Sequence, residues 1–439
     1  MTEPVRLAAL SPIRNGMDAT SYMRSLLPAG SSIMIDFRGE RDRNKHYWAA
    51  LYLEDGTFVN ELLVRSGYAK ITVNGPYDSL AEQFRPLVEE AMLHKKGVWG
   101  ITDPYYKQSV KMISIDGEAA IVTMNGELWV WGQFFEKPTR ILTGVVQART
   151  DWDTGAALKK DGTVWVWGFN NAAGWGNGEQ AYEVTIVPQQ VKGLSNILSL
   201  EKNNSSTIVI DRSGNVFGWG SNFNGRLGQM DFGPSNIIYS KPFKLPWTNV
   251  KEVKIGFPFT IVVKKNGTVW QTAPDSDQLV QLQELRNVVT VATSNTAALA
   301  LRKDGTVWGW GQWNNGIFGN QGLFTERPQQ IAGLSQIAKI ESGMFHFFAI
   351  DVKGNLFGWG NNEFGELGST SIGDRIEKPI RIPLMSGINQ VAAASEKSLF
   401  LKRDGTLWGV GHSPYSLFGE DYYEKYDLKY HQLTQLKIQ

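Results

Sequence analysis

The sequence contains no cysteine. Disulfides, thiolate zinc sites and cysteine nucleophiles are therefore excluded. An excess of either charge is also lacking, because 44 Lys and Arg balance 43 Asp and Glu for a net charge of +1. A near-neutral chain has no broad basic field for a phosphate backbone, so nucleic acid is disfavoured as a partner.

Long apolar runs are missing too, since nothing approaches the roughly 18 to 20 residues of a membrane helix. No membrane partner is expected. The start, MTEPVRLAAL (1–10), lacks the basic and apolar regions of a secretory signal. The chain as written is expected in the cytoplasm, whereas a true start upstream of Met1 would place it outside the cell or on its surface.

The five histidines show no paired ligand spacing, and no cofactor motif is present, so neither a metal nor a cofactor is assigned. The charged stretch DFRGERDRNKH (36–46) alternates in sign, which is typical of a solvated hairpin turn rather than a phosphate site. Chemistry must therefore be sought elsewhere in the chain.

What the chain does contain is a repeat. Seven times a Gly-turn is followed at once by an aromatic-rich strand, and the turn glycines are 36 to 53 residues apart. That period fits one four-stranded blade per copy, so an all-β seven-bladed β-propeller is predicted. The copies are NGELWVWG (125–132), DGTVWVWG (161–168), SGNVFGWG (213–220), NGTVWQTA (266–273), DGTVWGWG (304–311), KGNLFGWG (353–360) and DGTLWGVG (404–411).

Period-2 patterns predict four strands per copy, most clearly between 187 and 220. VPQQVKGL (187–194) is taken as the first strand, followed by NILSLEK (196–202), STIVIDR (206–212) and NVFGWG (215–220). The last segment, HQLTQLKI (431–438), resembles a first strand. It is predicted to pair into the blade that contains Gly126, which closes the ring and indicates a complete C-terminus.

Ten of the 16 tryptophans lie inside the repeated strand. A ligand-binding aromatic cage is one interpretation. The favoured one is packing between sheets, because a bulky residue that recurs at one blade position buries a large area in every copy.

The unit (Asp/Asn)-Gly-Thr-Val-Trp-x-Trp-Gly, followed by SNFNGRLG (221–228) or NNEFGELG (361–368), resembles the regulator of chromosome condensation repeat family, over about 109–439. One copy, SGMFHFFAIDVKG (342–354), also keeps the family's Gly and His. Members serve as a nucleotide exchange factor for a small GTPase, in chromatin docking, and as a β-lactamase inhibitor. The resemblance implies a propeller whose broad loop face grips another protein.

The irregular tips that follow the repeated strands are the candidate binding face, because exposed aromatics are over-represented among interface hot spots. The open alternative is that each aromatic packs under its own loop. The candidates are Trp175, Phe232, Tyr239, Trp313, Phe324, Tyr415, Tyr422 and Tyr423.

The first hundred residues have a different pattern. The run from Asp55 to Ala69, and the helix pattern of 81–100 ending in GVWG, resemble the staphylococcal nuclease family. That resemblance implies a small α+β domain with an oligonucleotide-binding (OB) type barrel. The predicted organisation is a truncated nuclease-like domain over 1–100, a linker over 101–108 and the propeller over 109–439.

The family's chemistry needs carboxylates for calcium and for the attacking water, and arginines for the transition state. By resemblance, one arginine survives as Arg6, while Ser11 and Arg14 take the carboxylate positions and Tyr47 takes the second arginine position. A shift by one residue puts Leu10 and Ile13 at the carboxylate positions instead. The domain is therefore predicted to be a degenerate nuclease.

The function predicted from sequence is that of a monomeric, non-enzymatic scaffold whose propeller recognises a protein partner. The alternative is that the nuclease-like domain retains nucleic-acid binding or a weak calcium-dependent phosphodiesterase activity.

Overall fold

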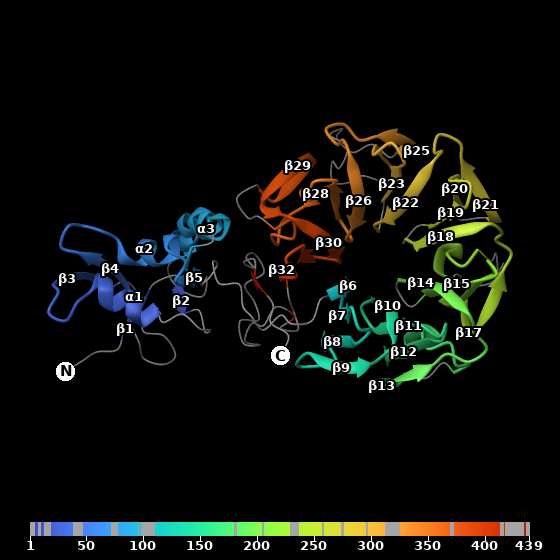
Figure 1. Ribbon diagram of the computed structural model, residues 1–439, viewed down its shortest axis with the longest axis horizontal. Helices are drawn as coiled ribbons and strands as arrows, with labels where there is room; N and C mark the ends of the chain where they lie inside the picture. Colours follow the sequence, from blue (N-terminus) through green and yellow to red (C-terminus); the bar gives the residue numbers. More distant parts are fainter. Residues whose placement is uncertain are drawn as a thin grey trace. The chain divides into compact units, whose positions relative to one another are not determined.

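The computed structural model describes residues 5–7, 10–12, 19–37, 47–71, 78–94, 96–97, 110–179, 182–203, 206–228, 237–256, 259–273, 276–295, 297–311, 325–368, 373–412, 417 and 434–435. The chain divides into two compact units, one built mainly from residues 1–104 and one built mainly from residues after 104 (Figure 1). No described helix is long and apolar enough to cross a membrane. The linker predicted over 101–108 lies outside the described residues.

The first unit contains a three-stranded sheet, β1-β4-β3, a two-stranded sheet, β2-β5, and three helices. This is the small α+β domain expected ahead of the propeller. Its elements are β1 (Val5–Leu7), β2 (Leu10–Pro12), α1 (Ala19–Leu26), β3 (Ile33–Phe37), β4 (Tyr47–Leu53), α2 (Val59–Arg65), β5 (Ala69–Ile71) and α3 (Asp78–Leu93).

Asn60 explains why the run from Asp55 to Ala69 folds as it does. Its side-chain oxygen accepts the N–H of Leu51 at 3.1 Å, and its amide donates to the carbonyl of Ala49 at 3.3 Å. The side chain is completely buried, so an apolar residue there would leave backbone groups of β4 unpaired. The motif therefore fixes α2 against β4.

The second unit is a ring of seven four-stranded antiparallel sheets, each a meander in chain order (Figure 1). We number these blades 1 to 7, and the first strand of each lies nearest the centre of the ring. Blade 1 consists of β6 (Val110–Ile115), β7 (Glu118–Thr123), β8 (Leu128–Gly132) and β9 (Thr139–Leu142). Blade 2 consists of β10 (Val145–Thr150), β11 (Thr154–Lys159), β12 (Val164–Phe169) and β13 (Val184–Gln190). Blade 3 consists of β14 (Ile197–Asn203), β15 (Ser206–Asp211), β16 (Val216–Ser221) and β17 (Ile238–Leu245).

Blades 4 to 7 repeat the arrangement. They consist of β18 (Val250–Ile255), β19 (Thr260–Lys264), β20 (Val269–Ala273) and β21 (Ser276–Leu282); β22 (Val288–Thr293), β23 (Ala297–Arg302), β24 (Val307–Gly311) and β25 (Thr325–Gln330); β26 (Ile337–Ser342), β27 (His346–Asp351), β28 (Asn355–Asn361) and β29 (Arg375–Ser386); and β30 (Ile388–Ala393), β31 (Lys397–Lys402), β32 (Leu407–Gly411) and β33 (Thr434–Gln435). Two single 3-10 turns, η2 (Asn171–Ala173) and η3 (Phe223–Gly225), follow β12 and β16.

The seven-bladed propeller is confirmed, but the predicted phase of the strands is wrong by one. β13, which contains the first half of VPQQVKGL, pairs with β12 of blade 2 and not with β14 of blade 3. The predicted closure is wrong for the same reason. β33 pairs with β32 of blade 7, and blade 1, which contains Gly126, has its own fourth strand, β9.

The Asp-Gly-Thr-x-Trp motif is a hydrogen-bonded unit. In blade 2 the hydroxyl of Thr163 donates to Asp161 at 2.6 Å and accepts the indole N–H of Trp165 at 3.0 Å. Lys159 on the neighbouring strand lies over the Trp165 ring, 5.4 Å from its centroid. Blades 4, 5 and 7 repeat the same three contacts at 266–270, 304–308 and 404–408. The recurrent Thr and first Trp are therefore explained within each blade.

The turn glycine also joins one blade to the next. The Gly162 carbonyl accepts the N–H of Ile197, the first residue of β14, at 3.1 Å. A Cβ at Gly162, whose φ is +83°, would lie 2.9 Å from Asn196 Cα. The same bond joins blades 1 and 2, 4 and 5, 5 and 6, and 6 and 7.

The ring closes by packing rather than by an exchanged strand. Buried apolar clusters lie between successive blades, and one of them combines Ile113 and Ile121 of blade 1 with Leu399 and Leu401 of blade 7. Closure therefore uses the same kind of contact as the other blade junctions, which hides the free faces of the end blades.

Candidate protein-interaction surface

The two ends of the propeller differ in how regular they are. We call the end that carries the turns between second and third strands the turn end, and the end that carries the connections between third and fourth strands the tip end. Every second-to-third turn has three or four residues, whereas the tip connections range from 2 to 22 residues. Variable loops on a constant scaffold are where binding residues concentrate.

Two of the predicted aromatic residues lie in the part of the chain that the structure describes. Trp175 is only 4% exposed and belongs to the apolar cluster between blades 2 and 3. Tyr239, in β17, is half-buried, with its ring centroid 4.2 Å from that of Phe243. The other six, Phe232, Trp313, Phe324, Tyr415, Tyr422 and Tyr423, lie outside the described residues.

Trp175 occupies a packing position that recurs in three tips. Leu227 and Leu367 take the same place in NGRLG and GELG, and both are completely buried. In this conformation the Trp175 ring cannot touch a partner, which matches the alternative that it packs under its own loop. Its role in binding stays an untested prediction.

The tip end holds an exposed tryptophan that the sequence reasoning missed. Trp152, between β10 and β11, is 44% exposed, and the ammonium of buried Lys397 from blade 7 lies 5.7 Å from its ring centroid. The available signal was TDWDTG (150–155), a turn with tryptophan between two acids. A half-exposed tryptophan held from two blades is a typical hot-spot residue.

A second tip-end cluster lies between blades 6 and 7. The rings of Phe364 and His412 stack with centroids 5.7 Å apart, and His412 Nδ1 lies 2.9 Å from the Glu396 carboxylate. Beneath them, burial raises the pKa of Glu366 to about 7, and the nearby Glu396 charge adds to that rise. The cluster combines an aromatic surface with a pH-sensitive carboxyl group.

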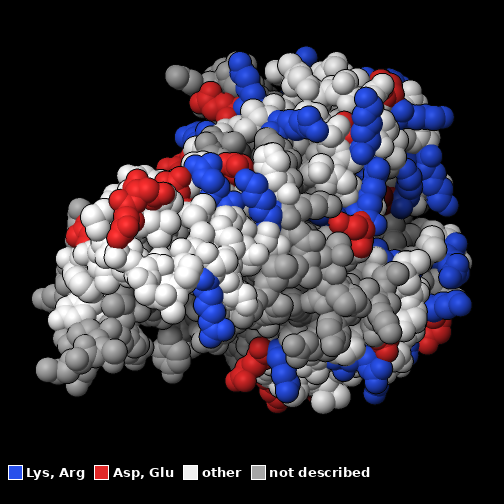
Figure 2. Space-filling model, turned by 60° about the vertical axis from the view of Figure 1, so that its left-hand side comes forward, with Lys and Arg blue, Asp and Glu red and all other residues white. Residues whose placement is uncertain are grey.

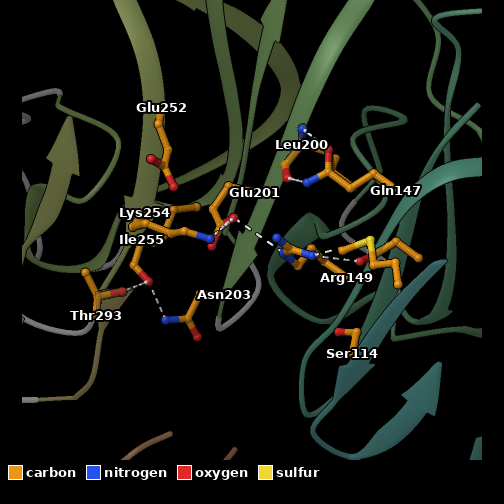
Figure 3. A network of polar contacts seen from close by, with 12 residues as sticks. Ser114, Gln147, Arg149, Leu200, Glu201, Asn203, Glu252, Lys254, Ile255 and Thr293 are labelled. Carbon is orange, nitrogen blue, oxygen red and sulfur yellow. Dashed lines mark hydrogen bonds and ion pairs between the residues drawn. The ribbon is translucent and has the colours of Figure 1, made fainter. Parts of the chain in front are cut away.

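The centre of the ring is lined by paired charges (Figure 3). Arg149, Glu201 and Lys254 occupy equivalent positions on the first strands of blades 2, 3 and 4, and Glu201 Oε2 lies 3.5 Å from Arg149 Nε and 3.1 Å from Lys254 Nζ. Asn203 donates to the carbonyl of Ile255 at 2.6 Å. A cavity of about 220 Å³ borders these groups.

These central charges compensate one another. Burial raises the pKa of Glu341 and of Glu252, although the Lys254 charge opposes both shifts. Burial acts to lower the pKa of Lys254, but Glu201 and the other acids more than offset it, so the pKa is raised. The network therefore links the first strands of the adjacent blades 2, 3 and 4 at the centre of the ring.

One histidine faces a hydroxyl in a way that resembles a catalytic pair. His346 Nε2 lies 2.8 Å from Ser398 Oγ, yet both side chains are completely buried, and burial lowers the pKa of His346 to about 3. A substrate cannot reach this pair. The contact instead fastens β27 of blade 6 to β31 of blade 7, which gives the family-like Gly and His a structural role.

The nuclease-like positions do not gather into a described metal site. Arg6 lies on β1 and Ser11 on β2, while Tyr47 begins β4 and packs edge-on against Phe37 at 5.3 Å. Arg14 lies outside the described residues. Of the alternative register, Leu10 is buried and Ile13 is undescribed. Within the described ranges no three His, Asp or Glu residues converge as metal ligands. Loss of nuclease activity stays a prediction.

Family models match both units. The model of the staphylococcal nuclease homologue matches residues 12–100. The model of the regulator of chromosome condensation (RCC1) repeat matches residues 213–263, 304–350 and 353–401, and a second RCC1 repeat model matches 337–366. The chain joins a nuclease-like domain to an RCC1-type propeller. The RCC1 matches cover blades 3 to 7, wholly or in part, and these blades share their four-stranded architecture with blades 1 and 2.

Curated relatives match at low identity. The chain is 24% identical over 302 residues to the "Secretion-regulating guanine nucleotide exchange factor" of Bos taurus, which covers 59% of this chain and 63% of that protein. It is 23% identical to "RCC1 domain-containing protein RUG3, mitochondrial" of Arabidopsis thaliana (67% and 74%) and 25% identical to "Ultraviolet-B receptor UVR8" of the same plant (60% and 64%). It thus spans less than two thirds of two of these relatives.

Solved structures share the fold of the RCC1-type propeller. Prp20p of Saccharomyces cerevisiae, described with its binding properties to Gsp1p and histones, has a TM-score of 0.56 at 17% identity, over 69% of this chain and 82% of that chain. Human WBSCR16 has a TM-score of 0.61 at 19% identity, over 68% and 88%.

Proposed function

We propose that this protein is a non-enzymatic, monomeric binding protein whose RCC1-type propeller recognises a protein partner through its tip end. One observation carries this proposal: the turns between second and third strands have three or four residues in all seven blades, whereas the tip connections vary from 2 to 22 residues. Length variation concentrated at one end of a repeat array is typical of a binding face.

Three described side chains are the proposed contacts at the tip end. Trp152 is 44% exposed, and Phe364 stacks on His412 at a centroid distance of 5.7 Å. All three lie on or beside connections of the tip end. Solved propellers of this fold are described with protein partners, among them yeast RCC1 (Prp20) with Kap60. The partner of this chain is proposed to be a protein as well.

The nuclease-like unit is proposed to be accessory and inactive. Its resemblance offers Ser11, Arg14, Leu10 or Ile13 where hydrolysis needs carboxylates, and Leu10 is buried. The purified chain with calcium and DNA is expected to release no nucleotides above the buffer background. Release above that background, or steeply salt-dependent binding of single-stranded DNA, would favour the alternative of a nucleic-acid-binding domain.

The tip-end proposal is tested by affinity capture with mass spectrometry. The full chain is compared with a Trp152→Ala/Phe364→Ala variant and with a matched Val187→Ala/Val280→Ala variant, which removes two exposed apolar side chains of the fourth strands β13 and β21. The tip-end variant is expected to lose a protein that the wild type and the matched variant both retain. An unchanged set of captured proteins, with unchanged melting temperatures, would contradict the proposal.

A further inference from the structure

The turn end carries a local excess of Lys and Arg over Asp and Glu. The seven turns, each taken with the two residues before its Gly-containing dipeptide, contain ten Lys or Arg against five Asp and one Glu, whereas the whole chain has a net charge of only +1. Figure 2 shows that Lys and Arg side chains do gather along one edge of the molecular surface, with few acidic side chains between them. The positive charge is therefore concentrated rather than evenly spread.

The five Asp of these turns are occupied inside the turns, and Glu127 pairs with Arg140 at 2.7 Å. Asp161, Asp304 and Asp404 accept the hydroxyl and N–H of the threonine two residues later, and Asp211 and Asp351 accept the side chain of an asparagine four residues later. The bases are divided. One set ends the second strands and lies over the tryptophan rings. The tenth base, Lys353, is exposed, and so is a second set, at the first position of the turns. That exposed set is Lys160, Arg212, Lys265, Lys303 and Arg403.

The exposed bases surround the mouth of the channel. Each base at the first position of a turn donates its backbone N–H to the carbonyl of the residue just before the first strand of the same blade. Arg403, for example, donates to Gly387 at 2.8 Å. Lys111 and Lys339, near the starts of β6 and β26, border a cavity of about 360 Å³ at this mouth, together with Asn389, Gln390 and Glu341. Burial raises the pKa of Glu341. The exposed cations of the rim continue into the mouth at Lys111 and Lys339.

Like charges are crowded at this mouth. Burial lowers the pKa of Lys339, and the positive charge of Arg403 lowers it further. Within the described residues, Lys339 Nζ donates hydrogen bonds to the backbone and side-chain oxygens of Asn389, which are neutral. A carboxylate in the cavity would relieve this repulsion and would accept hydrogen bonds from Lys111 and Lys339.

Aliphatic side chains interrupt the cations. Met124 is 66% exposed and Val352 is 58% exposed in their turns, while Leu198 and Val289, at the second positions of β14 and β22, are 55% and 41% exposed. Peptides bring apolar side chains to such positions, whereas single-stranded nucleic acid requires aromatic platforms for its bases. Trp165, Trp270 and Trp308 of this end each already hold a cation over the ring.

We propose that the turn end is a second binding surface, separate from the tip end, and that it takes an acidic peptide segment containing aliphatic residues. Carboxylates of the segment occupy the mouth beside Lys111 and Lys339 and face the rim at Arg403 and Lys265. Its aliphatic side chains cover Leu198 and Val289. Charge complementarity sets the orientation and makes the association salt-dependent.

The test is fluorescence anisotropy with a labelled synthetic peptide that alternates Glu and Leu, added to the full chain. A triple variant, Lys111→Gln/Lys339→Gln/Arg403→Gln, is expected to raise Kd about tenfold, because three exposed charge contacts are removed. Its dependence of log Kd on log salt concentration is expected to become shallower. The matched triple variant Lys137→Gln/Lys241→Gln/Lys378→Gln, which removes exposed lysines toward the tip end, is expected to bind within twofold of wild type.

Three outcomes would overturn the inference: equal weakening by both triple variants, equal affinity for a peptide that alternates Lys and Leu, or tighter binding of a single-stranded oligonucleotide of the same charge. A peptide that alternates Glu and Ser separates the aliphatic contribution and is expected to bind more weakly. None of these results bears on the tip end, because the capture experiment with Trp152→Ala/Phe364→Ala tests that surface by itself.

Discussion

The indole N–H of Trp131 donates to the backbone carbonyl of Leu417 over 2.7 Å, across 286 positions of the chain. Trp131 belongs to blade 1, and Leu417 follows the third strand of blade 7. The indole of Trp219 in blade 3 makes the equivalent bond to Gly174 in the tip of blade 2, at 3.0 Å. The last junction of the ring is therefore built like an internal junction.

Where the preceding tip is short, a side chain replaces the missing carbonyl. Glu118 of blade 1 accepts the indole N–H of Trp167 at 2.8 Å, and Gln271 of blade 4 accepts that of Trp310 at 3.1 Å. The tips of blades 1 and 4 have six and two residues. A buried indole N–H needs a partner, so a junction with a short tip supplies one from a strand.

Leu417→Ala is expected to destabilise the propeller by about 2–4 kcal/mol, because its side chain is 1% exposed and packs in the cluster between blades 7 and 1. Urea unfolding followed by tryptophan fluorescence measures the change. Leu198→Ala, at a side chain that is 55% exposed, is the control and is expected to change stability by less than about 0.5 kcal/mol. Equal effects of the two variants would show that Leu417 does not close the ring.

Lys202→Met is expected to lower the free energy of unfolding by about 3–5 kcal/mol. Lys202 Nζ lies 2.7 Å from Asp151 Oδ2, and both side chains are at most 3% exposed, so the variant leaves a buried carboxylate without its countercharge. Thermal unfolding compares it with Arg140→Gln, which breaks the exposed ion pair to Glu127 and is expected to cost at most about 1 kcal/mol. A Lys202→Met/Asp151→Asn double variant is expected to cost less than the sum of its single variants.

Gly162→Ala and Gly405→Ala separate two roles of the turn glycine. Both glycines have a positive φ, +83° and +86°, so each alanine pays about 1–2 kcal/mol of backbone strain. A Cβ at position 162 would also lie 2.9 Å from Asn196 Cα, whereas nothing lies within 4 Å at position 405. Gly162→Ala is therefore expected to lower the urea midpoint more. Equal midpoints would show that the blade junction accommodates the methyl group.

The Gly-turn and aromatic strand predict the blades because both are local: the turn needs a positive φ, and the threonine and first tryptophan bond within one hairpin. The phase of the blades could not be read in this way. β13 and β14 are joined by a short connection, 191–196, which resembles a hairpin in sequence, while the true pairing of β12 with β13 spans a 14-residue tip. Short chain separation therefore favoured the wrong neighbour.

The candidate surface was only partly predictable. Trp175 was singled out because it is aromatic in an irregular tip, but its place in the tip is that of Leu227 and Leu367, so the fold buries it. Trp152 and the turn-end cations depend on which strand ends meet around the ring. Residues far apart in sequence come together only through sevenfold closure, which no local pattern encodes.

Glu118→Gln is expected to flatten part of the pH dependence of stability. Burial raises the pKa of Glu118 to about 7 from its ordinary value of 4.5, although the Trp167 indole opposes the shift. Between these values the folded protein binds more protons than the unfolded chain, so this group's contribution is fully present below about pH 4.5 and is lost as the pH rises through 7. Asp116 and Glu366, with pKa values raised by burial to about 7, act in the same direction.

Urea unfolding at pH 5 and pH 8 measures the effect. The free energy of unfolding of the wild type is expected to be lower at pH 8 than at pH 5, and the Glu118→Gln variant is expected to lose less of it, by up to about 3 kcal/mol. The exposed Glu136→Gln is the control and should keep the wild-type difference; if Glu118→Gln keeps it as well, Glu118 is not the buried acid that titrates.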